Sequence, residues 1–101
     1  MYELRYSESF QKSLEATISY WQQKLELSDD KISEFVSSIY KSTEALKRYP
    51  YLAENVATKY GFNQPTYRVV IGKSYAFFYR VNQKKVEIGS LYNTKQMKVS
   101  F

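Results

Sequence analysis

The residues best suited to chemistry are the lysines and arginines that gather in the second half of the chain. Residues 49–101 carry eight Lys or Arg against two Asp or Glu, which gives this half a net charge of +6. Residues 1–48 carry seven against eight, for a net charge of −1. Clustered cations attract phosphate backbones or acidic proteins, so the asymmetry favours an anionic partner. A solvated basic surface is the plain alternative.

Histidine and cysteine are both absent from the 101 residues. Their absence excludes the usual zinc ligands, Ser-His and Cys-His nucleophilic pairs, disulfides and the most common general base near neutral pH. The three glycines, at positions 61, 72 and 89, form no phosphate-binding glycine loop. Any catalysis must therefore use other groups.

The first half of the chain predicts a strand followed by two helices. Residues 2–6 alternate apolar and polar, which predicts a short strand with Tyr2, Leu4 and Tyr6 facing inward. A helix is expected from Ser7 or Ser9, and its apolar face recurs every three or four residues: Phe10, Leu14, Ile18, Trp21 and Leu25. Ser28 and the aspartates after it predict a second helix start. The apolar stripe of that helix comprises Ile32, Phe35, Val36, Ile39, Thr43 and Leu46.

The second half predicts a loop and then three strands. The second helix must end near Arg48–Tyr49, since Pro50 disfavours helix geometry in the residue before it. Residues 51–66 contain Gly61, Asn63 and Pro65, so we expect them to be mostly loop. Three β-rich runs follow, separated by short polar turns, and predict an antiparallel meander over residues 67–71, 75–81 and 85–91.

These elements predict one α+β domain over residues 1–101, with an antiparallel helical hairpin on one face of a mainly antiparallel sheet of about four strands. The other face of the sheet is expected to be free. Strand alternation places Tyr67, Val69 and Ile71 on one face, and Arg68 and Arg80 on the free face. The chain has no signal peptide pattern and no run of about 18 apolar residues, so we expect a cytoplasmic protein.

Three segments carry a resemblance to a known family. The order of Tyr67-Arg68-Val69-Val70, then Tyr75-Ala76-Phe77-Phe78-Tyr79-Arg80-Val81, then Val86-Glu87-Ile88 resembles the RelE/ParE superfamily of bacterial type II toxin-antitoxin toxins. The resemblance covers nearly the whole chain. It implies a growth-arresting toxin without a cofactor, neutralised by an antitoxin that wraps its surface. Two targets are implied: ribosome-bound messenger RNA, cleaved without a metal, or DNA gyrase, which is inhibited.

The resemblance also implies site residues for a nuclease in which the ribose 2′-hydroxyl attacks the adjacent phosphate. Arg68 matches the first basic strand position. Ala76 and Gln96 stand where the nuclease pattern has cations. Nearby residues that could replace them at the catalytic site are Lys73, Arg80 and Tyr92, and further RNA contacts are expected from Lys84, Lys85, Lys95 and Lys98. Glu54 is interpreted as a solvated carboxylate outside the site.

Each of these residues also has a structural interpretation. Arg68 could cap the sheet or pair with Glu87, Tyr92 could be an ordinary half-buried aromatic, and the Lys84-Lys85 pair could protect a hairpin tip. Three functions stay open at this point: a ribosome-dependent endonuclease, a gyrase-inhibiting ParE-like toxin, and a non-catalytic toxin-like RNA-binding protein.

Overall fold

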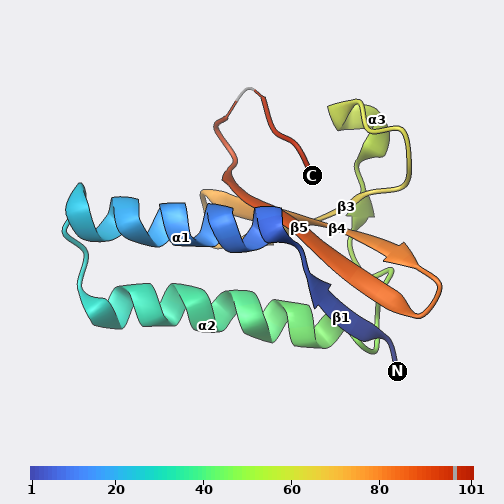
Figure 1. The fold of residues 1–101 in the computed structure, drawn as a ribbon, viewed down its shortest axis with the longest axis horizontal. Helices are drawn as coiled ribbons and strands as arrows, with labels where there is room; N and C mark the ends of the chain where they lie inside the picture. Colours follow the sequence, from blue (N-terminus) through green and yellow to red (C-terminus); the bar gives the residue numbers. More distant parts are fainter. Residues whose placement is uncertain (97) are drawn as a thin grey trace.

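The computed structural model describes residues 1–96 and 98–101 and has the predicted α+β architecture (Figure 1). The elements in chain order are β1 Glu3–Tyr6, α1 Glu8–Gln23, α2 Asp29–Leu46, β2 Glu54–Asn55, α3 Ala57–Tyr60, β3 Tyr67–Ile71, β4 Tyr75–Asn82 and β5 Lys85–Asn93. The strands form one sheet in the order β1-β5-β4-β3-β2. β1 runs parallel to β5, and the other neighbours are antiparallel.

The prediction of a loop over residues 51–66 was wrong in part. β2 pairs with β3 through Glu54 opposite Arg68 and Asn55 opposite Tyr67, which makes a fifth strand. α3 follows it and ends at Gly61, whose φ of 74° is the left-handed conformation that glycine adopts at helix ends. Both elements are too short to be stable alone, so tertiary contacts with the sheet hold them.

The helical hairpin covers one face of the sheet. Ser7 caps α1 and Ser28 caps α2, each by accepting a hydrogen bond from the backbone three residues on. α1 ends at Gln23, so Leu25 lies beyond the helix and is 49% exposed, and its predicted place on the apolar face was wrong. The two helices run antiparallel, with their connecting turn at the end of the molecule away from α3 (Figure 1). No helix among the described residues is long and apolar enough to cross a membrane.

The main core lies between the hairpin and the sheet. Its buried residues come from α1, α2, β3, β4 and β5: Phe10, Leu14, Ile39, Leu46, Ile71, Phe77, Tyr79, Val86, Ile88 and Leu91. Polar atoms at its margin are paired. Tyr6 and Thr43 share a hydroxyl hydrogen bond of 2.9 Å, and Trp21 Nε1 donates to Tyr75 Oη at 3.0 Å.

A β-bulge in β5 changes which side chains reach each face. Between Phe77 and Tyr79, β4 advances two residues, whereas their partners Leu91 and Ile88 are three residues apart. The extra residue lets both Ile88 and Leu91 face the helices. It also sends Tyr92 to the opposite face.

The face opposite the helices, here called the second face, is not free, contrary to the prediction. α3 and the segment 98–101 lie over it and help to build a second apolar cluster. Its buried members are Val56, Ala76, Phe78 and Tyr92, and its partly buried members are Tyr60, Phe62, Val99 and Phe101. A site on this face is therefore framed by short segments that the strand pattern alone does not reveal.

Candidate functional site

The candidate site lies on the second face, where aromatic rings hold Tyr60 against the sheet. The rings of Phe78 and Tyr92 are stacked with centroids 4.7 Å apart. Tyr60 meets Phe78 edge-on at 5.3 Å and Tyr92 at 6.2 Å. Such edge-on and stacked pairs fix ring positions beyond what burial alone achieves. The Tyr60 hydroxyl is thereby held at a defined place at the end of α3.

Two donors converge on the Tyr60 hydroxyl. Arg68 Nη1 donates to Tyr60 Oη at 2.9 Å, and Tyr92 Oη donates to the same oxygen at 3.3 Å. The other terminal nitrogen of Arg68, Nη2, lies 3.7 Å from Glu54 Oε1. The Arg68 side chain is 21% exposed and that of Glu54 is 71% exposed, so this ion pair is weak.

This arrangement favours the deprotonated form of Tyr60. The hydrogen bond from Tyr92 and the guanidinium of Arg68 lower the pKa of Tyr60, and the ammonium of Lys59 acts in the same direction. Desolvation opposes them without reversing the shift. Burial, followed by the neighbouring Tyr60, raises the pKa of Tyr92, so Tyr92 stays a donor. The two tyrosines therefore have opposite proton preferences, a pattern typical of acid-base sites.

An open hollow of about 420 Å³ adjoins Tyr60 and is lined by Lys59, Tyr60, Lys98 and Val99. Both lysines are exposed, and the Lys59 Nζ lies 6.0 Å from the centre of the Tyr60 ring. Two ammonium groups beside a tyrosine of lowered pKa can bind an anion and accept a proton next to it. The hollow thus places two exposed lysines next to a tyrosine that can accept a proton.

The structure brings together some of the residues expected from the sequence. Arg68, Tyr92 and Lys98 all lie at or beside Tyr60. Arg80 lies on the same face, but its Nε donates to Thr66 Oγ1 at 3.0 Å, and Arg80 also packs against Phe101.

The remaining expected residues lie elsewhere. Lys73 is exposed in the turn before β4, at the opposite end of that strand from Arg80. Lys84 lies over the ring of Tyr2 at 5.1 Å, and Lys85 begins β5 at the hairpin end. Lys95 is exposed in the turn that follows β5. These four lysines do not contact Tyr60.

The two positions that lack the expected cations have structural roles. Ala76 is fully buried in the second apolar cluster, opposite Tyr92 in the sheet register. Gln96 accepts a hydrogen bond from the Asn93 backbone through its Oε1 at 3.1 Å. Ala76 therefore packs in the core and Gln96 stabilises a turn, at the two positions where the resemblance implies a cation.

Sequence reasoning missed Tyr60 and Lys59, whereas Glu54 is largely exposed, as expected of a solvated carboxylate. All three lie in the segment expected to be loop. The spacing of Val56 and Tyr60, four residues apart and followed by glycine, is typical of one helical turn with its cap and was the available signal.

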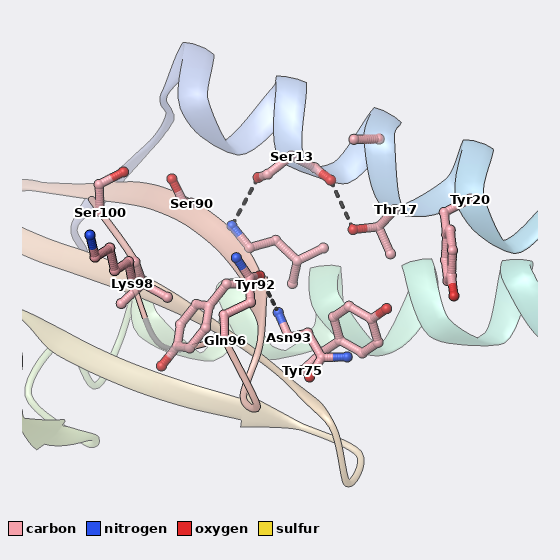
Figure 2. A pocket seen from close by; sticks show the side chains of 13 residues that line it. Ser13, Thr17, Tyr20, Tyr75, Ser90, Tyr92, Asn93, Gln96, Lys98 and Ser100 are labelled. Atoms are coloured by element: carbon pink, nitrogen blue, oxygen red, sulfur yellow. Dashed lines mark hydrogen bonds between the residues drawn. The ribbon is translucent and has the colours of Figure 1, made fainter.

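A second hollow, of about 500 Å³, is lined by α1, the end of β5 and the segment 98–100 (Figure 2), and it shares Lys98 and Val99 with the first. Several of its polar groups are already hydrogen-bonded within the fold. Ser13 Oγ accepts from the Leu91 backbone at 2.9 Å, and Thr17 Oγ1 donates to the Ser13 carbonyl. It holds one cation, Lys98, and no carboxylate among the described residues. We therefore place the candidate chemistry at Tyr60.

Comparisons with known proteins support the fold. No protein-family model and no curated protein matches the chain. A solved structure titled "Chromosomal ParDE TA system from P. aeruginosa" contains a chain similar to this one, with a TM-score of 0.73 and 14% identity over 94% of this chain and 98% of that chain. At this identity the similarity concerns the fold, and it confirms the RelE/ParE-like fold expected from the sequence.

Proposed function

We propose that this protein is the toxin of a type II toxin-antitoxin system and that it arrests growth by cleaving messenger RNA on the ribosome. The fold shared with a chain of a ParDE system supports the toxin assignment. The +6 charge of residues 49–101 supports an anionic target. The single observation that carries the nuclease proposal is the Tyr60 hydroxyl, which accepts hydrogen bonds from Arg68 and Tyr92 beside two exposed lysines.

In the proposed reaction, the scissile phosphate binds in the hollow between Lys59 and Lys98. The Tyr60 phenolate takes the proton of the ribose 2′-hydroxyl, and the freed oxygen forms a bond to phosphorus. The bond from phosphorus to the 5′ oxygen breaks, which leaves a 2′,3′-cyclic phosphate and a 5′-hydroxyl. The 5′ oxygen takes its proton from the Lys98 ammonium. Arg68 positions the phenolate and adds positive charge where the transition state is most negative.

The test is to map messenger RNA 5′ ends after the protein is induced in growing cells. We expect new ends with the wild type and with Lys41→Gln, which removes an exposed charge on α2. Arg68→Gln should yield few new ends. Growth arrest with an unchanged set of ends would contradict the nuclease proposal.

Gyrase inhibition is the second candidate, because Ala76 and Gln96 do not supply the cations expected of a nuclease. A gyrase-inhibiting toxin of this kind would be ParE-like, and the similar solved structure is of a ParDE system. Purified protein would then block supercoiling by gyrase and stabilise its DNA cleavage complexes. Normal supercoiling in the presence of excess protein would exclude this candidate.

The proposed function implies two partners and one place of action. An antitoxin would neutralise the protein, and an acidic one would suit the basic second half of the chain. Residues 1–101 would act as one toxin domain on the ribosome and its messenger RNA in the cytoplasm.

A further inference from the structure

A pocket separate from the Tyr60 hollow lies on the second face, at the end where β4 turns into β5. Its volume is about 330 Å³. Its lining includes Arg5, Gln64, Arg80, Asn82, Lys85 and Glu87. It shares no lining residue with the Tyr60 hollow. The lining combines cations, amides and one carboxylate.

Arg80 is held in a fixed orientation at this pocket. Its Nε donates to Thr66 Oγ1 at 3.0 Å, and its Cζ lies 3.9 Å from the centre of the Phe101 ring and 5.4 Å from that of Phe62. No described residue accepts a hydrogen bond from its two terminal nitrogens. These nitrogens form a preoriented pair of parallel donors.

Glu87 provides acceptors on the neighbouring strand. It stands directly opposite Arg80 in the β4-β5 register and opposite Arg5 in the β1-β5 register. Arg5 is instead tied to Glu3 at 3.0 Å, and Glu87 forms no salt bridge with any described residue. The pocket therefore has a donor pair on one strand and, directly opposite it on the next, a carboxylate that attracts Arg80 without forming a salt bridge.

We infer that this pocket reads a guanine base of single-stranded RNA, an inference that rests on the proposed action on RNA. Guanine offers two adjacent acceptors, O6 and N7, that match the arginine fork. Its N1–H and its exocyclic amine are donors that match a carboxylate such as Glu87. Proteins read splayed RNA bases on both of these edges.

Other ligands suit the pocket less well. Adenine carries an amine where guanine has O6, so it would set a donor against the Arg80 fork. A bare phosphate would be attracted by the pocket's cations but would use neither the carboxylate of Glu87 nor the spacing between Glu87 and Arg80.

The pocket is close enough to the Tyr60 site to read the same strand. Arg68 stands opposite Phe78, and Arg80 lies two residues further along β4. Arg68 and Arg80 are therefore diagonal neighbours, about 7 to 8 Å apart. The inferred base belongs to a nucleotide next to the one whose phosphate reacts.

The test measures binding of 2′-O-methyl RNA trinucleotides, which cannot be cleaved, by NMR titration without ribosomes. The central base is guanine, adenine, 7-deazaguanine or hypoxanthine. Guanine should bind on the order of tenfold more tightly than adenine. The 7-deaza base removes the N7 acceptor and should weaken binding to the wild type, but less so to Arg80→Lys. Hypoxanthine lacks the exocyclic amine and should weaken binding to the wild type, but not to Glu87→Gln. Lys41→Gln is the control.

The outcomes separate the inference from the proposed function. Equal affinity for all four bases would overturn the inference while RNA binding stands. No binding of any trinucleotide would overturn it as well. If an oligoglutamate peptide binds more tightly than RNA and shifts the Arg80 resonances, the inference is overturned and the ligand is an acidic protein segment. Guanine preference without messenger RNA cleavage in cells would uphold the inference and contradict the nuclease proposal.

Discussion

The two faces of the sheet differ in how they are built. The helix-covered face packs against two long capped helices, and its core is made of aliphatic and aromatic side chains. The second face is covered by a four-residue helix and a short segment, and it mixes aromatic rings with Arg68, Arg80 and tyrosine hydroxyls. Burial on the first face supplies most of the folding free energy. The second face keeps polar groups in fixed but accessible positions, which a site requires.

The largest effect should come from emptying the helix-covered core. Phe77 is fully buried there, so Phe77→Ala should lower the free energy of unfolding by about 3 to 5 kcal/mol. Chemical denaturation followed by circular dichroism measures this. A loss below about 1 kcal/mol would contradict the tight packing of Phe77 between the helices and the sheet.

Removal of the Tyr60 hydroxyl should affect activity more than stability. Under the proposed nuclease function, Tyr60→Phe should slow cleavage of ribosome-bound messenger RNA by about 100-fold or more, since a positioned general base contributes that much. The free energy of unfolding should fall by only about 1 kcal/mol, the value of one hydrogen bond. Tyr20→Phe, which changes an exposed tyrosine on α1, is the matched control. An unchanged rate with Tyr60→Phe would remove Tyr60 from the mechanism.

A substitution at Gly89 should displace the C-terminal segment that covers the second face. A Cβ at this position would lie 2.6 Å from ring carbons of Phe101, so Gly89→Ala should displace the segment 98–101 and cost about 1 to 3 kcal/mol. The Ser90 amide, which donates to the Phe101 carbonyl at 2.7 Å, should then exchange faster with solvent. On a Phe101→Ala background the ring clash is removed and only the contact with the backbone carbonyl of residue 101 at 2.8 Å remains, so the same change should cost less. Equal costs on both backgrounds would contradict the contact.

The smallest effect should come from the ion pair between Glu54 and Arg68. Glu54 is largely exposed, so Glu54→Gln should lower the free energy of unfolding by less than about 1 kcal/mol. High salt should have a similarly small effect on the wild type. A larger loss in denaturation would mean that Glu54 belongs to a buried network.

The sequence predicted the helix-covered face well and the second face poorly, for a physical reason. Regular periodicity marks long elements, so the span of β3 and the cap at Ser28 agree with the structure. β2 and α3 are too short for periodicity, and contacts with residues distant in sequence stabilise them. The bulge that directs Tyr92 to the second face also cannot be predicted from the alternation of apolar and polar residues.

The candidate site was predictable in part, and strand alternation explains the prediction of Arg68. Arg68 was placed on the correct face by alternation, and the structure then joined it to Tyr60, which comes from the unpredicted α3. The contact of Glu54 with Arg68 depends on β2 in the same way. Side chains from irregular segments thus complete a site that regular strands begin.

The acidity of Tyr60 is the central claim, and a pH titration of the folded protein by NMR with ¹³C-labelled tyrosine tests it most directly. Tyr60→Phe identifies the resonance. Because its folded-state pKa is lowered, Tyr60 should lose its proton below pH values of about 10, the ordinary value, and Arg68→Gln should move the inflection upward. Titration of Tyr60 at or above that value in the wild type, unmoved by Arg68→Gln, would contradict the account.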